Sequence, residues 1–451
     1  MRVCLVTPPS PYLINDKSLP WLGPLWVAAC LRERGHEVSV LDLAGNPDYL
    51  QFAAMHAQSV GADVYGLTAT APDYPLAVQI RDAIRSVNPQ QRIILGGAHA
   101  SMAEVVGPGW DCTVRGDGFH TAERALSEVG TIFAYRRGEI LEDVDALPLP
   151  ARDLIDVTSY DFRVVGERAT SIFTIWGCAQ GCTFCSGRDI FAYRKMRWMS
   201  PHRVLYELDA IRDNYGFTAF SDFADEWNLN RQKLLDRCAA IAAHHWHPIL
   251  RCFCKAEHLD DEAAGAMARA GVVEVLVGVE SGSDRILKLI KKNTSWEING
   301  AARLAAKRNG LRFKAATMIG LPSETREDIQ KTKEWLLTFK PDAFDCTVFS
   351  PMPGSPIYDH PEKYAVGLQI ENGDGTFVPY KTFPGNYRSK VRTDTLSAED
   401  LVVLRDEIDR DVRQALSLES PGRNDLHDSS MGQSSGHLVA GLPASPAVLC
   451  G

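Results

Sequence analysis

The stretch IFTIWGCAQGCTFC, residues Ile172 to Cys185, joins a β-type run to a short loop that carries three cysteines. Residues 172–176 are all β-branched or aromatic, which favours a strand. Two glycines, Gly177 and Gly181, allow the loop after this strand to stay compact. The stretch therefore predicts a strand that ends in a loop with three thiols, spaced CxxxCxxC.

Three thiolates within eight residues can ligate three irons of a cubane iron–sulfur cluster. The fourth iron then stays open, so it can bind a substrate or cofactor and pass it an electron, whereas a zinc site closed by four ligands cannot. Two other interpretations are a zinc site completed by a distant Cys or His, and unligated core cysteines. A spacing of three and then two residues, with no fourth ligand nearby, argues against zinc.

Strand-like runs continue outward from this stretch in both directions and alternate with helical ones. Such alternation predicts parallel α/β architecture. Downstream it predicts a partial (β/α)6 barrel over 171–356, with strands at 172–176, 217–221, 249–254, 273–279, 312–319 and 344–349. Upstream it predicts a doubly wound, Rossmann-like domain over 1–130, with five strands at 2–7, 37–43, 63–68, 92–95 and 111–115.

The remaining segments are expected to connect or extend these two domains. Residues 131–170, which contain Leu147-Pro-Leu-Pro150, are expected to form a linker. Residues 357–418 are expected to form a helical extension, whose last helix opens with a capping box at Ser397. Residues 419–451 are rich in Ser, Gly and Pro, so we expect a disordered tail.

Charge and length limit the kinds of partner. The chain has 451 residues, with 48 Lys and Arg against 57 Asp and Glu, a net charge of −9. No global basic field is present to hold nucleic acid. Because the sequence shows neither a signal peptide nor an apolar run of about 18 residues, we expect a cytoplasmic protein without a membrane span. Its eleven cysteines are then expected to stay reduced.

With Phe184 as the aromatic of CxxxCxΦC, the loop resembles that of the radical S-adenosylmethionine (SAM) superfamily. The resemblance implies that Cys178, Cys182 and Cys185 hold a [4Fe-4S] cluster whose open iron binds SAM. Reductive cleavage of SAM then gives a 5′-deoxyadenosyl radical, which abstracts hydrogen from the substrate.

Further segments carry the resemblance along the barrel. They are VGVESGS at 277–283, TMIGLP at 317–322 and SPMPGSP at 350–356. The cofactor-binding residues that it implies are Phe184, Lys255, Gly278, Glu280, Ser281 and Met318. Lys255 stands where an arginine is common in the family, so it either contacts SAM or substrate or pairs with a neighbouring glutamate; the two interpretations are equally favoured.

The first domain resembles the cobalamin-binding domain that precedes this barrel in some members. Its matching features are Thr-Pro-Pro at 7–9, a helix over 21–34, Thr68-Ala-Thr70 and Gly96-Gly97. The Asp-x-His-x-x-Gly loop, which supplies a histidine to cobalt in some cobalamin proteins, is absent. The resemblance therefore leaves cobalamin binding open.

Three acids, Asp222, Asp225 and Glu226, follow the second barrel strand and are candidates for the catalytic acid of a dehydration. With this cluster the chain resembles the radical SAM aminoglycoside 3′-dehydratases of apramycin biosynthesis. That resemblance implies deoxygenation of a cationic aminosugar in antibiotic biosynthesis, with a separate reductase acting on the product. The alternative is a cobalamin-dependent C-methyltransferase of a secondary metabolite.

An electron donor is the protein partner that this chemistry requires. Basic residues near the cysteine loop, Arg188, Arg194, Lys195 and Arg197, could dock an acidic donor such as flavodoxin, or could simply be solvated. Two other classes fit less well. A transfer RNA methylthiotransferase would need a further cysteine-bearing domain and an RNA-binding module, and a corrinoid carrier would leave the three-cysteine barrel unused.

Overall fold

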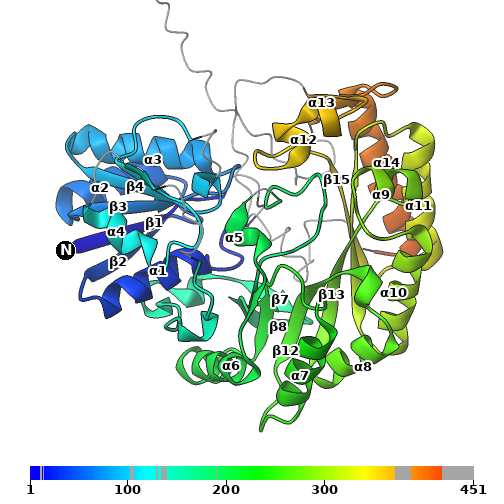
Figure 1. The fold of residues 1–451 in the computed structure, drawn as a ribbon, viewed down its shortest axis with the longest axis horizontal. Helices are drawn as coiled ribbons and strands as arrows, with labels where there is room; N and C mark the ends of the chain where they lie inside the picture. The colour runs from blue at the N-terminus through cyan, green and yellow to red at the C-terminus, as the bar shows by residue number, and fades with distance from the viewer. Residues whose placement is uncertain are drawn as a thin grey trace, which may run out of the picture.

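The computed structural model describes residues 1–418 except 11, 12, 14, 102–105, 128–130, 134–139, 189 and 371–387. Its first domain is a parallel sheet of six strands in the order β2-β1-β3-β4-β5-β6 (Figure 1). The strands are β1 Arg2–Thr7, β2 Glu37–Asp42, β3 Val64–Thr68, β4 Arg92–Gly96, β5 Cys112–Val114 and β6 Thr131–Phe133. The expected five strands are present, and β6 adds a sixth at the edge, parallel to β5.

Helices cover both faces of this sheet. They are α1 Leu22–Glu33, α2 Tyr49–Ser59, α3 Tyr74–Val87 and α4 Thr121–Ser127. Buried side chains of α2 and α3 share one apolar core, and those of α1 and α4 share another. The domain is therefore doubly wound, as the alternating pattern predicts.

The second domain is a curled seven-stranded sheet in the order β15-β14-β13-β12-β11-β8-β7. Its strands are β7 Phe162–Val164, β8 Glu167–Ile172, β11 Ala219–Asp222, β12 Ile249–Cys254, β13 Val272–Glu280, β14 Arg312–Ile319 and β15 Ala343–Val348. All neighbours are parallel except β7 and β8. The predicted partial barrel of six parallel strands is confirmed (Figure 1).

An outer row of helices connects the barrel strands. They are α6 Pro201–Tyr215, α7 Arg231–Ala242, α8 Asp261–Arg269, α9 Asp284–Leu289, α10 Trp296–Arg308 and α11 Arg326–Phe339. Each long helix begins at a residue suited to capping; the Ser200 hydroxyl, for example, accepts a hydrogen bond from the Arg203 N–H at the start of α6.

The first barrel strand differs from the prediction of 172–176. Strand β8 ends at Ile172, and β9 Ile175–Trp176 instead pairs antiparallel with β10 Arg197–Trp198. The backbone N–H and hydroxyl of Thr174 bind the carboxylate of Asp222, which draws the chain away from the sheet. The apolar run is therefore split between two sheets. A local sequence pattern does not reveal this tertiary contact.

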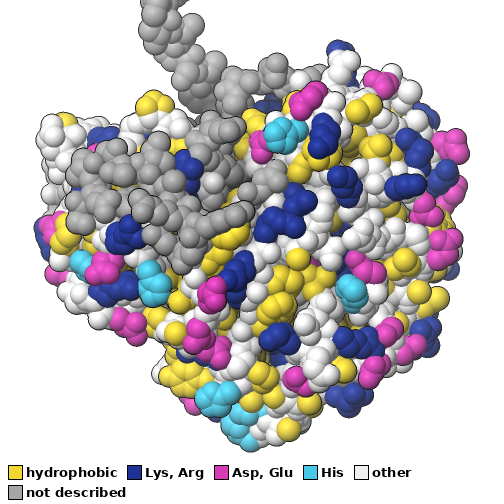
Figure 2. Space-filling model, viewed as in Figure 1, with side chains coloured by type: hydrophobic (Ala, Val, Ile, Leu, Met, Phe, Trp, Pro, Cys, Tyr) yellow, Lys and Arg dark blue, Asp and Glu magenta, His cyan; other side chains and the backbone are white. Residues whose placement is uncertain are grey.

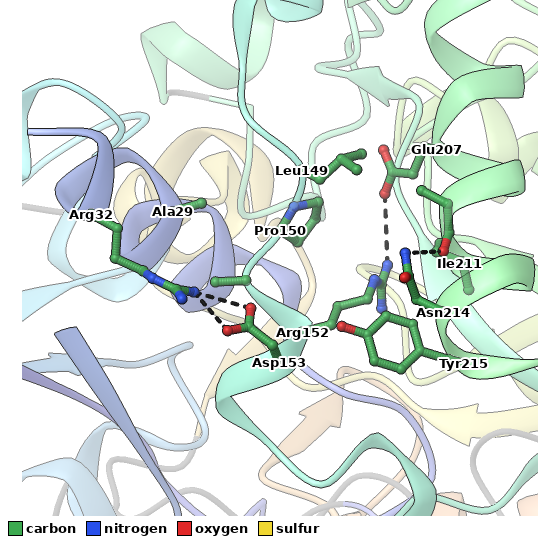
Figure 3. A pocket seen from close by; sticks show the side chains of 12 residues that line it. Ala29, Arg32, Leu149, Pro150, Arg152, Asp153, Glu207, Ile211, Asn214 and Tyr215 are labelled. Carbon is green, nitrogen blue, oxygen red and sulfur yellow. Dashed lines mark hydrogen bonds and ion pairs between the residues drawn. The ribbon is translucent and has the colours of Figure 1, made fainter.

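The expected linker over 131–170 also supplies strands, since β6 joins the first sheet and β7 and most of β8 join the second. Its residues 140–161 lie between the domains, where Ala151 N–H donates to Leu25 O of α1. Figure 3 shows this junction, with Arg152 directed at Glu207 of α6 at 3.7 Å and Arg32 paired with Asp153 at 2.9 Å. The segment is therefore packed between the two domains.

The C-terminal part follows the last barrel strand, and its long helix packs against β15 and α11. It comprises α12 Pro356–Asp359, α13 Pro361–Tyr364, β16 Leu368–Ile370, β17 Val391–Thr393 and α14 Ala398–Leu416. The predicted capping box at Ser397 is present, and the Arg405 guanidinium of α14 donates to Cys346 O in β15. The expected disordered tail, 419–451, lies outside the described residues. Within the described residues, every helix is too short or too polar to cross a bilayer.

Candidate active site

The three-cysteine loop begins at Gly177, a position that only glycine fits. Its φ is +87°, and a Cβ there would lie 2.5 Å from Lys195 O and 2.6 Å from Tyr193 O. The Gly177 N–H donates to Asp225 Oδ2 at 2.6 Å, and the Cys178 N–H donates to Tyr193 O at 2.8 Å. The short helix α5, Phe191–Arg194, and the segment that follows β11 therefore hold the start of the loop.

The cysteine thiols suit a polynuclear cluster better than a single zinc ion. Cys182 is buried, Cys178 and Cys185 are partly buried, and none is in a disulfide. Zinc with Zn–S bonds of about 2.3 Å would bring its sulfurs to within roughly 4 Å of one another. Among the described residues, only Asp209, His244 and His245 form a trio of ligand atoms within 4.8 Å. The three sulfurs are thus spread more widely, as ligands of different irons would be.

Burial raises the pKa of all three thiols, that of Cys178 to about 12. Thiols in this environment stay protonated at neutral pH unless a cation replaces the proton. The donor set therefore fits a group that supplies its own positive charge, as iron does.

The three predicted catalytic acids do not share one environment. Asp222 is fully buried, and its carboxylate accepts hydrogen bonds from Thr174, from Ala224 N–H at 2.9 Å and from Trp227 Nε1 at 2.7 Å. Asp225 binds the Gly177 N–H, and burial raises its pKa to about 6. These two carboxylates hold the barrel and the loop together, and their role as the catalytic acid stays a prediction.

Glu226 is different because it keeps hydrogen-bonding capacity. Its Oε2 is buried and has no hydrogen-bond partner among the described residues. Burial raises its pKa to about 8, against the opposing charges of Lys292 and Lys255. At neutral pH this carboxyl group holds a proton that it can donate.

Two lysines lie close to Glu226 and Cys182, since their charges act on both groups. The Lys292 ammonium binds Glu280 Oε1 at 2.8 Å. The Lys255 ammonium lies 2.6 Å from Glu257 Oε1, as the ion-pair interpretation expected, although this contact lacks hydrogen-bond geometry. Cations, carboxyl groups and thiols therefore meet at the carboxyl ends of the barrel strands.

Gly278 makes room for the ion pair of Glu280 with Lys292. A Cβ at Gly278 would lie 2.3 Å from Glu280 Oε1 and 2.7 Å from Lys292 Nζ. Glu280 itself has a φ of +62°, next to a register shift between β13 and β14. This bulge turns the glutamate toward the lysine.

The other three predicted cofactor-binding residues differ in burial. Ser281 is fully buried, and its hydroxyl accepts the Ser283 N–H at 3.1 Å and lies 3.4 Å from Thr332 Oγ1, so it holds the turn after β13. Phe184 and Met318 are partly buried against the barrel core. Their contact with SAM stays a prediction.

Sequence reasoning missed Lys292 and Tyr193. Lys292 follows α9 and carries no motif, so only its contact with Glu280 identifies it. Tyr193 hydrogen-bonds Asp225 and Cys185, and burial together with Asp225 raises its pKa. An aromatic residue shortly after the loop was the one available signal.

A large apolar cavity of about 580 Å³ lies between the two domains. The first domain contributes Leu13, Ser18, Leu19, Pro20, Trp21, Leu22, Gly23, Trp26, Thr70 and Phe119, and the barrel region contributes Ser171, Phe173, Trp176, Phe223, Phe253 and Leu276. These described lining residues include no charged side chain. This lining suits a flat or apolar group, and the predicted cationic aminosugar stays a prediction.

A second, narrower crevice of about 200 Å³ lies at the carboxyl ends of the first sheet. It is lined by Gly66, Thr68, Gly96, Gly97, Gly116, Asp117 and Gly118, among others. Gly23 and Phe119 line both hollows, so the crevice and the interdomain cavity adjoin. Together they form one candidate site in two parts, with a larger part between the domains and a smaller part in the first domain.

Comparison with known families agrees with the division of the chain into two domains. Residues 172–336 match the radical SAM superfamily, and residues 16–126 match the B12 binding domain. With the fold and the three-cysteine loop, these matches support a radical SAM enzyme that carries a cobalamin-type domain ahead of its barrel. A [4Fe-4S] cluster and SAM are the cofactors of this superfamily.

Particular relatives narrow the comparison. An uncharacterized methyltransferase of Pyrococcus horikoshii is 26% identical over 80% of this chain and 83% of its own length. The anaerobic magnesium-protoporphyrin IX monomethyl ester cyclase of Rubrivivax gelatinosus is 23% identical over 66% of this chain and 58% of its own length.

Two solved structures share the fold. The radical SAM methyltransferase TsrM of Kitasatospora setae, with cobalamin and a [4Fe-4S] cluster bound, has a TM-score of 0.61 and 18% identity, over 83% of this chain and 81% of that chain. The cobalamin-dependent radical enzyme OxsB has the same TM-score and identity, over 81% of this chain and 56% of that chain. Of these four proteins, the Pyrococcus relative and TsrM are named methyltransferases, and none is named a dehydratase, so the predicted dehydration has no support from them.

Proposed function

We propose that the protein is a cobalamin-dependent radical SAM methyltransferase that acts on carbon of a small molecule of secondary metabolism. The two adjoining cavities carry the proposal. A wide apolar cavity of about 580 Å³ suits a macrocycle, and the adjoining crevice of about 200 Å³ suits its nucleotide tail. The crevice lies where doubly wound domains bind nucleotide-like groups.

The residues present fit the implied cofactors. Cys178, Cys182 and Cys185 would hold the cluster, while Glu226 and Lys255 offer SAM a carboxyl group and a cation with unused hydrogen-bonding capacity. When bound, cluster and SAM supply a radical that abstracts hydrogen, and cobalamin supplies the methyl group. The chain's own contribution is to position these groups and to exclude water.

Aromatic side chains provide the water-free surface. Trp26 of α1 lies 5.3 Å from Trp176 and 6.3 Å from both Phe119 and Phe173, measured between ring centroids. These four aromatic rings come from both domains and line the cavity at their junction. A reactive carbon radical is protected there from solvent.

The electron donor would dock beside the cysteine loop. Three of the four predicted basic residues are used internally: Arg194 binds Gln180 O, Lys195 binds Glu142 and Arg197 binds Asp117. Arg188 instead lines a pocket of about 330 Å³ with the loop residues Gly181 and Thr183 and with Lys291 and Lys363. Figure 2 shows dark blue side chains gathered on this side of the barrel.

This basic pocket favours an acidic, flavodoxin-like donor. Charge reversal at Arg188, Lys291 and Lys363 should slow SAM cleavage with an acidic protein donor and remove or reverse the slowing by added salt, whereas reduction by dithionite should be unaffected. Equal slowing with both reductants would show that these residues do not act in donor docking.

Dehydration is the second candidate because Glu226 is a buried carboxyl group whose pKa is raised to about 8. Such an acid could protonate a leaving hydroxyl group, and the keto product would then need a separate reductase. Release of water from the substrate in the absence of cobalamin would favour dehydration.

The deciding experiment follows the methyl group. The holoenzyme is incubated with SAM that carries a deuterated methyl group and with a panel of candidate apolar metabolites, with and without cobalamin. Methyl transfer proceeds only with cobalamin if the proposal is correct. Turnover without cobalamin and without label in the product contradicts it.

A further inference from the structure

A buried carboxylate joins the loops that follow β1 and β3. Asp73 is fully buried, and its Oδ1 accepts the Ser10 hydroxyl at 3.1 Å. Its Oδ2 accepts the Thr70 hydroxyl and, at 3.4 Å, the Thr70 N–H. Ser10 follows β1 and Thr70 follows β3, so one side chain links two loops that are far apart in sequence.

These two loops lie at a special place in the sheet. In the order β2-β1-β3-β4-β5-β6, the chain reverses its direction of travel between β1 and β3. Open α/β sheets bind their ligands at the carboxyl ends of the strands at such a switch point. The Ser10, Asp73 and Thr70 network therefore spans the position where a ligand of this domain is expected.

Thr70 also lines the interdomain cavity. A hydroxyl group carries one hydrogen, and that of Thr70 is donated to Asp73, which as a carboxylate can only accept. Burial raises the pKa of Asp73 to about 6, so the group is still an anion at pH 7.5. The lone pairs of Thr70 Oγ1 are therefore left for the cavity, and the hydrogen bond to the anion makes that oxygen a better electron donor.

We propose that Thr70, held by Asp73 and Ser10, presents its hydroxyl oxygen to cobalt from the side of the N-terminal sheet. The oxygen contacts cobalt either directly or through one bound water. This inference rests on the proposed cobalamin site. Thr70 would stand in for the histidine of the absent Asp-x-His-x-x-Gly loop. Asp73 and Ser10 are positioning residues because they act only through Thr70.

The test reads cobalt by electron paramagnetic resonance. The full chain with its cluster is loaded with cob(II)alamin, desalted and measured in ordinary water and in ¹⁷O-enriched water. Thr70→Val keeps the volume and removes the oxygen, Thr70→Ala removes it without added bulk, and Thr70→Ser keeps the hydroxyl group as the matched control.

The expected spectrum of the wild type has no nitrogen splitting. Both oxygen-free variants should show a larger cobalt hyperfine splitting, typical of loss of an axial ligand, while Thr70→Ser should match the wild type. Broadening by ¹⁷O identifies a water held by Thr70, and its absence identifies the hydroxyl group itself. A wild-type nitrogen splitting, or an unchanged spectrum in a Thr70→Val protein that retains cobalamin, overturns the inference. If the wild type retains no cobalamin, the proposed function fails with it.

Discussion

Replacing Gly177 by alanine should cost the three-cysteine loop much of its stability. An alanine at a φ of +87° is strained by about 1–2 kcal/mol. Its Cβ would also lie 2.5 Å from Lys195 O and 2.6 Å from Tyr193 O, and relieving such overlap costs about 1–3 kcal/mol. The two contributions together predict a loss of about 2–5 kcal/mol.

Gly181 of the same loop provides the matched control. A Cβ there meets no atom within 4 Å, and its φ is not in the left-handed region. Gly181→Ala is therefore expected to stabilise slightly or to change nothing, because it restricts only the unfolded chain, an effect of about 0.4–1 kcal/mol.

The assay compares the two variants with the wild type in urea unfolding of the apoprotein and in iron content after anaerobic reconstitution. Gly177→Ala should unfold at lower urea and bind less iron, while Gly181→Ala should match the wild type in both. The reasoning is refuted if the two variants unfold within about 0.5 kcal/mol of each other and bind equal iron.

Three further outcomes are expected. Cys182→Ala should abolish cluster iron and 5′-deoxyadenosine formation but leave the circular dichroism spectrum intact; undiminished SAM cleavage would exclude the cysteine as a ligand. Glu226→Gln should weaken SAM binding or slow turnover by tenfold or more, on the order of 1.4 kcal/mol, with an unchanged melting temperature; wild-type kinetics would remove Glu226 from the site. Burial raises the pKa of Glu324 to about 8 from 4.5, so the folded chain binds more protons and its stability falls as pH rises between these values. The stability of the Glu324→Gln variant should therefore fall less as pH rises. An unaltered pH profile of stability would contradict the raised pKa of Glu324.

Much of the barrel could be predicted from sequence because buried parallel strands are continuous apolar runs. Strands β12 and β14 match the predicted 249–254 and 312–319. Interactions between distant segments could not be predicted in this way. Asp222 and Glu226 look alike in sequence, yet hydrogen bonds occupy the first carboxylate and leave one oxygen of the second unpaired.

The site shows the same division between local pattern and tertiary contact. The spacing of the cysteines is local, so the loop and its cluster chemistry were accessible from sequence. The pairing of Glu280 with Lys292, and the contact of Thr70 with Asp73 and Ser10, depend on the bulge in β13 and on the order of β1 and β3. Likewise, the apolar character of the interdomain cavity emerges only when α1 packs against the barrel, which a local pattern does not reveal.

Cobalamin retention tests the central claim most directly. The cluster is reconstituted anaerobically, excess hydroxocobalamin is added, the protein is desalted, and cobalt, iron and sulfide are measured per chain. The account predicts stoichiometric cobalt together with a full cluster. A full cluster without cobalt would contradict it and would make the first domain a scaffold for a different radical reaction.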